Sequence, residues 1–274
     1  MKRALFFTAG ALAAVPVVGN ALWRRTSAEI ERAIRSHWRG ASGTVTAGQL
    51  ADVPAPVARF FRRTLCDGQR IIRSARIHQT GEFFFNGAWR PMRAYQVFSA
   101  APPAFMWDAR ISMAPFMPVY VRDSYVAQRA TMRADMLAVY PVVNQSGTPE
   151  LNAGALLRYL GEAAWFPTRL VPGDGLTWKP VDDERAEATL TDGPTTVSLE
   201  FRFDDQGDLV ELYSPGRFRD VNGTSVPTPW RVRALGQEVV GGVRMMTPAV
   251  VEWVLPEGPM PYWRGKIRDV KYTY

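Results

Sequence analysis

The chain has 274 residues, of which 47% are hydrophobic and 22% charged, with one cysteine and two histidines. This composition is that of a globular protein with a sizeable core, and a single cysteine excludes an internal disulfide. The formal net charge is +7, and residues 1–65 account for it, so the remainder of the chain is neutral. A neutral body argues against a nucleic-acid-binding domain, which needs a basic face to neutralise phosphates.

Residues 1–23 have the layout of a signal peptide or membrane anchor. Two basic residues precede an uncharged run from Ala4 to Trp23, which is long enough to span a bilayer. Small residues from Gly19 to Ala21 suit a signal peptidase, whereas Trp23-Arg24-Arg25 resembles an interfacial anchor. We expect a membrane-associated protein of the cell envelope with an extracytoplasmic body. An uncleaved anchor, a cleaved signal and a buried helix stay open, and so does the orientation.

Residues 24–65 are predicted to form amphipathic basic helices. Thr26 and Glu29 have the spacing of a capping box. The apolar residues that follow recur at helical spacing, with arginines off the stripe they form: Ile30, Ala33, Ile34 and Trp38. This stripe fits either a membrane surface or packing on the body. The stretch DVPAPVARFFRRTL predicts a second short helix, with Val57, Phe60, Phe61 and Leu65 facing the core.

Residues 66–274 are predicted to form a single antiparallel β domain. The hydrophobic period changes to two, and Asn86-Gly87 separates two alternating runs as a hairpin turn does. About ten to twelve strands follow one another without βαβ alternation. One helix, at about residues 150–165, interrupts them. The pattern indicates a mainly β fold, namely a large curved antiparallel sheet or an open half-barrel.

Candidate catalytic residues are few. The chain has no Gly-rich phosphate loop and no Gly-x-Ser-x-Gly elbow, and we expect neither a metal site nor a cofactor. Asp108, Asp123 and Glu162 could act as acid or base, with Arg110 as an anion clamp. The alternative is a structural network that includes Arg122, in which Glu162 pairs with Arg158 one helical turn away.

Aromatic residues are the other notable feature, with nine Trp, nine Tyr and fourteen Phe. On a curved sheet they could line an apolar cavity, although large aromatics also fill ordinary cores. The candidate ligand-binding residues are Trp89, Phe105, Trp107, Tyr120, Tyr125, Trp165 and Phe166.

Several stretches between residues 50 and 274 resemble an uncharacterised bacterial family known only as a domain of unknown function. They include PPAFMWDARISM, LLRYLGEAAWFPTRLVP, VSLEFRFDDQGDLV and PYWRGKI. This resemblance implies no activity. A looser likeness, carried by FRFDDQGDLVEL and GVRMMTPAVVEW, is to the lipoprotein carriers (LolA- and LppX-like). It implies a half-closed antiparallel sheet that holds an acyl chain, although the lipobox cysteine is absent.

The preferred interpretation is a membrane-associated protein that binds an apolar or lipid-like ligand in a concave β sheet. Its expected partners are a membrane lipid surface and that ligand. One alternative is a carboxylate-type hydrolase that uses Asp108, Asp123 or Glu162. Another is a structural envelope protein with a fully packed sheet.

Overall fold

The computed structural model describes residues 2–36, 38 and 43–274, and the side chains of the first helix from Val17 onward. Most side chains of the expected signal or anchor, and those of His37 and Arg39, lie outside the described residues. Within the part of the chain that is described, no helix combines the length and apolarity that crossing a membrane requires.

The fold is built on one large, curled antiparallel sheet. Thirteen of its strands lie side by side in the described chain, and every neighbouring pair is antiparallel. In spatial order they are β6 (Tyr140–Ser146), β5 (Arg129–Met136), β4 (Met117–Val126), β3 (Ala104–Ala114), β2 (Ala88–Ser99), β1 (Ser74–Phe85), β15 (Gly258–Thr273), β14 (Ala249–Leu255), β11 (Thr224–Ala234), β10 (Leu209–Val221), β9 (Thr195–Phe203), β8 (Arg185–Asp192) and β7 (Leu176–Pro180). The predicted fold, an open antiparallel half-barrel, is confirmed.

The strand count exceeds the predicted ten to twelve because short strands were missed near the C-terminus. A separate hairpin, β12 (Gln237–Val240) and β13 (Val243–Met246), is only four residues a side, which is too short for alternation to reveal. The Asn86-Gly87 turn, in contrast, is confirmed. Both residues have positive φ, and Phe85 pairs directly with Ala88 across the turn.

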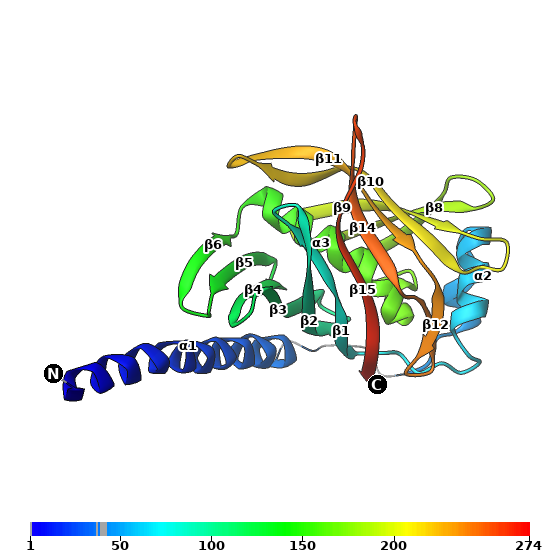
Figure 1. Cartoon of the computed structure of the whole chain (residues 1–274). Coiled ribbons are helices and arrows are strands. Elements are labelled where there is room, and N and C mark those ends of the chain that lie inside the picture. The colour runs from blue at the N-terminus through cyan, green and yellow to red at the C-terminus, as the bar shows by residue number, and fades with distance from the viewer. Residues whose placement is uncertain (1, 37, 39–42) are drawn as a thin grey trace.

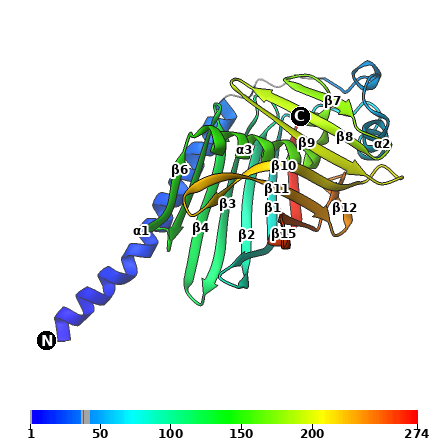
Figure 2. The ribbon, with the colours of Figure 1, turned by 90° about the horizontal axis from the view of Figure 1, so that it is seen from above.

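The concave face is filled by the helical insertion. It comprises α3 (Pro149–Glu162) and the short helices η2 (Ala163–Trp165) and η3 (Pro167–Leu170), close to the predicted limits. The Thr148 side chain caps α3 by accepting a hydrogen bond from the Leu151 backbone N–H. From there α3 crosses between β4 and β5 on one side and β8 to β10 on the other (Figure 2). Leu156 and Leu160 are fully buried in this core.

A close approach helps α3 reach the sheet. A Cβ on Gly161 would lie 3.0 Å from Cδ1 of Leu212, so this helical position favours glycine. At the other end of the core, α2 (Ala55–Thr64) buries Val57, Phe60 and Phe61 as predicted. Cys66, which follows it, is exposed.

The opposite, convex face carries α1 (Lys2–Ser36), which lies beneath β2 to β4 (Figure 1). This single helix corrects the predicted start at Thr26. The Thr26 hydroxyl donates to the Leu22 carbonyl in the preceding turn of the same helix. It therefore does not cap a helix that begins at Thr26. The predicted apolar stripe packs on the body, because Ile34 is buried against Val97 and Met106.

Candidate functional site

A cluster of four aromatic rings, three of them partly exposed, lies on the concave side of the sheet. It consists of Phe83, Trp230, Trp253 and Tyr262, and is called here the aromatic mouth. The Tyr262 ring stacks on Trp253 at a centroid distance of 5.7 Å and meets Phe83 edge-on at 5.9 Å. Trp230 is buried in the main core, and the other three pack against that core while keeping part of their surface in solvent. The aromatic mouth is therefore an apolar surface that is continuous with the core and accessible from solvent.

Sheet register brings these four rings together from four strands. Trp230 on β11 and Trp253 on β14 are direct cross-strand partners. Tyr262 is the extra residue of a β-bulge on β15, opposite Val251 and Glu252. A bulge turns a side chain away from strict alternation, and here Tyr262 reaches both Phe83 and Trp253.

Polar groups at the mouth belong to Trp230, Tyr262 and an arginine of β10. The Trp230 Nε1–H and the Arg217 Nη1 both donate to the Tyr262 hydroxyl, at 2.9 and 3.1 Å. The Arg217 guanidinium carbon also lies 4.8 Å from the Trp230 ring centroid and 5.6 Å from that of Trp253. Such contacts are favourable cation–π pairs. They hold a positive charge at the edge of an apolar surface.

Deeper on the same face, a chain of hydrogen bonds connects α3 to β1–β4. Arg158 donates to Glu162 at 2.9 Å and to Asp123 at 2.7 Å. The Glu162 carboxylate also accepts from Gln96 at 2.7 Å. Gln96 in turn accepts from Gln79, which accepts from the Trp107 indole, at 2.8 and 2.9 Å. Each buried polar side chain of this network therefore has a partner.

Glu162 is the acidic group of this network whose pKa is shifted. Burial raises the pKa of its carboxyl above the ordinary 4.5, although hydrogen bonds from Arg158 and Gln96 oppose the rise. Both of its oxygens are already engaged, Oε1 by Arg158 and Oε2 by Gln96. The geometry is that of a buried connector between α3 and the sheet.

The predicted ligand-binding aromatics separate into two groups. Five of them, Phe105, Trp107, Tyr125, Trp165 and Phe166, are buried in the main core, with Trp107 at 5% and Trp165 at 8% exposure. Trp89 and Tyr120 lie on the convex face instead, where Trp89 contacts Arg264 and Phe84, and Tyr120 contacts Trp23 and Arg110. The structure thus does not gather the seven around one cavity.

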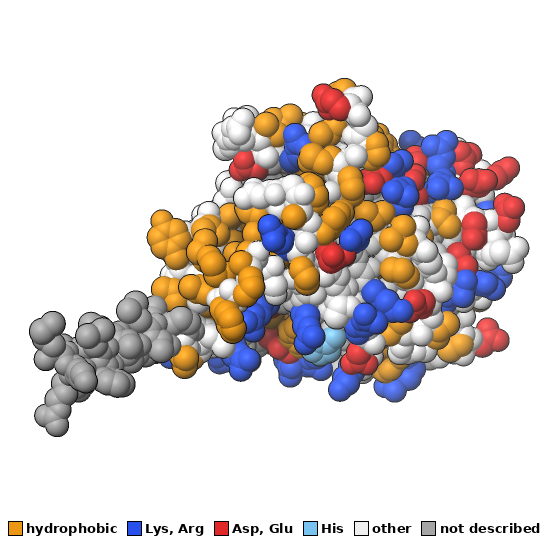
Figure 3. Space-filling view, viewed as in Figure 1, with side chains coloured by type: hydrophobic (Ala, Val, Ile, Leu, Met, Phe, Trp, Pro, Cys, Tyr) orange, Lys and Arg blue, Asp and Glu red, His pale blue; other side chains and the backbone are white. Residues whose placement is uncertain are grey.

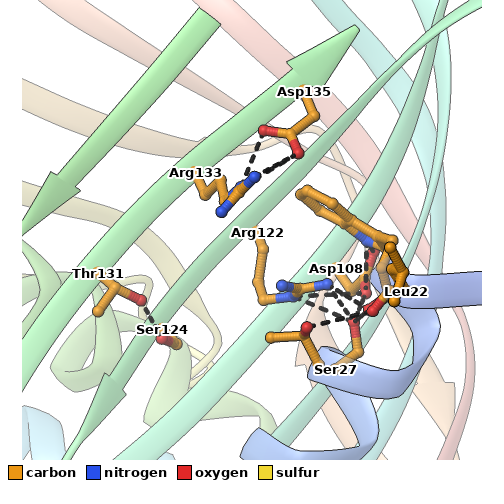
Figure 4. A network of polar contacts seen from close by, with 10 residues as sticks. Leu22, Ser27, Asp108, Arg122, Ser124, Thr131, Arg133 and Asp135 are labelled. Carbon is orange, nitrogen blue, oxygen red and sulfur yellow. Dashed lines mark hydrogen bonds and ion pairs between the residues drawn. The ribbon is translucent and has the colours of Figure 1, made fainter. Parts of the chain in front are cut away.

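Asp108 lies on the convex face and holds α1. The Trp23 indole donates to its carboxylate at 3.0 Å, and the Ser27 hydroxyl donates to it as well. Arg122, only 4% exposed, donates to Ser27 at 3.0 Å and to the Trp23 carbonyl at 2.7 Å, and lies 4.0 Å from the Trp23 ring centroid. In Figure 4 the side chains of Ser27, Asp108 and Arg122 converge between helix and sheet. We call these four residues the Asp108 network.

Two grooves run along α1 on either side of this network. One, of about 430 Å³, is lined by Tyr95, Asp108, Arg110 and Tyr120 among others. The second, of about 590 Å³, lies between the helix and the β5–β6 turn and includes Ala138 and Val139. Both are within the size range of ligand pockets. Both grooves are shallow, and residues of α1 form one wall of each.

The single network predicted from Asp108, Arg110, Arg122, Asp123 and Glu162 is wrong. Arg122 and Asp123 are successive residues of β4, so their side chains point to opposite faces. Asp108 accordingly pairs with Arg122 on the convex side, whereas Asp123 and Glu162 both pair with Arg158 on the concave side. Among the described side chains, no three His, Cys, Asp or Glu residues are grouped so that they could hold a metal ion.

The residues of the aromatic mouth were not among the predicted site residues. No local signal shows that Phe83 and Tyr262, far apart in the sequence, meet across adjacent strands. The PYWRG motif was the available pointer, because it contains the bulged Tyr262.

The chain belongs to the DUF6544 family, a family of unknown function. The sequence profile of this family matches residues 43–265. The family resemblance seen in the motifs is thereby confirmed. No curated protein matches the chain. Among solved structures, it is similar to a DUF1329 family protein from Desulfovibrio piger (12% identity, TM-score 0.41, 73% of this chain and 86% of that one). It is also similar to a LolA superfamily protein from Nitrosomonas europaea (12%, 0.40, 80% and 92%). A third is a putative outer membrane lipoprotein-sorting protein domain from Vibrio parahaemolyticus (7%, 0.38, 73% and 85%).

Proposed function

We propose that this protein binds an apolar or lipid-like ligand at the aromatic mouth and does so at a membrane surface of the cell envelope. The observation that carries the proposal is the partial exposure of Phe83, Trp253 and Tyr262 on the concave face. Aromatic rings at the edge of a core offer a large apolar contact area, with few groups that a ligand must desolvate. The ligand would lie along the open sheet beyond α3.

Membrane association is the second part of the proposal, and it combines a sequence feature with a surface. Residues 1–23 have the composition of a signal or anchor, and the described start of α1 exposes Val17, Val18 and Leu22. The helix contacts the β5–β6 turn there, since a Cβ on Gly19 would lie 2.6 Å from the Ala138 carbonyl oxygen.

Exposed apolar residues surround this contact, and Figure 3 shows hydrophobic side chains gathered over β4 to β6. We call them the apolar tip patch: Phe116, Met117, Val139, Tyr140 and Val142. An apolar patch beside an apolar helix favours a bilayer as the occupant, because both could enter the same interface. Arg24 and Arg25, which follow on α1, are suited to anionic headgroups.

The ligand proposal is tested by photolabelling the full-length protein in phosphatidylcholine nanodiscs with a neutral, photoactivatable long-chain alcohol. Label is expected on peptides that contain Phe83, Trp253 or Tyr262. Trp253→Ala should reduce it strongly, and Trp89→Ala, which removes a ring from the convex face, should leave it unchanged. Label confined to residues 1–23, with none at the mouth, would refute ligand binding there.

A carboxylate-type enzyme is the second candidate, and the convergence of Asp123 and Glu162 on Arg158, with a raised Glu162 pKa, is the observation in its favour. A substrate would have to displace a hydrogen bond from Arg158 or Gln96 to reach the Glu162 carboxylate. Hydrolysis of a long-chain ester that Glu162→Gln abolishes, while the variant still binds the alcohol probe, would establish this alternative.

A further inference from the structure

Three arginines surround the aromatic mouth, and we call them the arginine rim: Arg90, Arg217 and Arg219. Arg217 lies over Trp230 and Trp253, and Arg219 lies 5.9 Å from the Trp253 ring centroid. The two alternate along β10, so they share a face. Arg90 is the direct cross-strand partner of Phe83.

The arginine rim has no anionic partner within the described chain. None of its members is within ion-pair distance of a described carboxylate, and the Nε of each is buried without a hydrogen-bond acceptor. The pattern differs on the convex face of the sheet, where Arg264 of β15 pairs with Glu82 of β1 at 2.6 Å. Three half-buried cations whose Nε–H donors have no acceptor in the described chain are costly unless a partner supplies a negative charge.

Contacts with aromatic rings do not supply the missing negative charge or hydrogen-bond acceptors. A cation–π contact uses the flat face of a guanidinium and leaves the N–H donors at its edge free. Arg217 makes one such edge bond, to the Tyr262 hydroxyl. A carboxylate or phosphate group matches the remaining donors in geometry and charge.

We infer that the ligand of the mouth is an anionic amphiphile, whose charged group binds the arginine rim while its apolar chain lies on Phe83, Trp253 and Tyr262. This inference rests on the proposed function and specifies its ligand class. The shared chemistry is an anionic group joined to an apolar chain. A carboxylate or a phosphate could provide that group.

The test measures competition against the neutral alcohol probe in the full-length protein. The competitors are the matching unlabelled alcohol, the fatty acid, the alkyl phosphate and inorganic phosphate alone. For wild type, the concentration that halves labelling should be about tenfold lower for at least one anionic amphiphile than for the alcohol, as one charge-assisted contact provides. Which of the two anionic amphiphiles competes better identifies the headgroup.

Arg217→Gln/Arg219→Gln and Arg90→Gln should reduce that preference to about twofold or less, the level expected when the charge-assisted contact is lost. Arg264→Gln removes the same charge from the opposite face and should keep the preference. Because the preference is a ratio within one protein, a general loss of stability does not mimic the effect. Thermal unfolding of each variant confirms that it is folded.

Equal competition by alcohol and anionic amphiphiles in wild type would overturn the inference and leave the proposed function intact. Competition by inorganic phosphate as strong as that by the alkyl phosphate would also overturn the inference, because the site would then bind a free anion without an apolar chain. No label at the mouth at all would refute the proposed function itself.

Discussion

Arg158 donates from Nε to Oε1 of Glu162, one helical turn further along α3, at 2.9 Å. The same guanidinium reaches Asp123 on β4 at 2.7 Å, so one cation joins a helix carboxylate to a sheet carboxylate. Its flat face lies 4.9 Å from the Trp107 ring centroid. Glu162 therefore helps to fasten α3 to the concave face, where the polar chain must stay fully bonded to be tolerated.

Glu162→Gln tests this role through the pH dependence of stability. Burial raises the pKa of Glu162 in the folded state, so between 4.5 and the raised value the folded protein binds more protons than the unfolded one. The free energy of unfolding contributed by this group is fully present below 4.5 and falls as the pH rises through the folded pKa. We expect urea unfolding midpoints to show this fall in wild type and not in Glu162→Gln.

The comparison needs a control because other carboxylates titrate in the same range. Glu150→Gln removes a carboxylate from the first turn of the same helix and should retain the wild-type fall. A wild-type minus Glu162→Gln difference that stays constant with pH would show that the two states of the protein share one Glu162 pKa.

Trp165→Ala separates a core aromatic from a site aromatic. The Trp165 ring is 8% exposed and packs edge-on against Phe98. Its truncation should lower the free energy of unfolding by about 3–5 kcal/mol, as for other buried aromatics. Trp89→Ala, at the rim of the β1–β2 hairpin, should cost much less, because part of that ring is already in water. Urea unfolding of both variants measures the difference, and equal costs would contradict the assignment of Trp165 to the core.

The features that the sequence predicts are those that depend on residues close together in the chain. The Asn86-Gly87 turn and the alternating runs on either side of it are local signals, and they indicated the antiparallel sheet. The spacing of Arg158 and Glu162 predicted their ion pair. Strand alternation alone implies that Asp108 and Trp107, as successive residues of one strand, point to opposite faces.

What the sequence did not predict depends on contacts between distant segments. The partner of Asp108 is Trp23 on α1, 85 positions earlier, and nothing local to either residue indicates the pairing. Tyr262 reaches Phe83 only because a bulge reorients it, and bulges have no strong sequence signal. The aromatic mouth and the α1 contact are therefore properties of sheet order, which the residue pattern leaves undetermined.

Asp108→Ala is predicted to release α1 from the sheet. The substitution leaves the Trp23 indole, the Ser27 hydroxyl and the buried Arg122 without their carboxylate. Losing the acceptor of a buried network costs about 2–3 kcal/mol, which corresponds to roughly a 30- to 160-fold loss of amide protection. Hydrogen exchange should therefore accelerate in residues 22–36 and not in β2 to β4.

Arg110→Ala is the matched control, because Arg110 lies on the same strand and face as Asp108 and contacts Tyr120 alone among the described rings. Its exchange in residues 22–36 should stay at the wild-type rate. Unchanged exchange in Asp108→Ala would mean that the apolar contact of Ile34 with Val97 and Met106 is sufficient to hold the helix.

Phe116 provides the sharpest test of membrane association. It lies in the β3–β4 turn with 95% of its surface exposed and a φ of 62°. Bulky side chains avoid this left-handed region, where glycine is unstrained. Phe116→Gly should therefore raise the free energy of unfolding by about 1 kcal/mol while it removes an apolar group from the tip patch. If that group enters a bilayer, the more stable variant should bind anionic vesicles more weakly in co-sedimentation.

Val239→Ser, which removes a 65%-exposed apolar residue from β12, should bind as wild type does. Vesicle binding by Phe116→Gly equal to that of wild type would exclude the β3–β4 turn from the membrane contact, since stability and binding are expected to change in opposite directions.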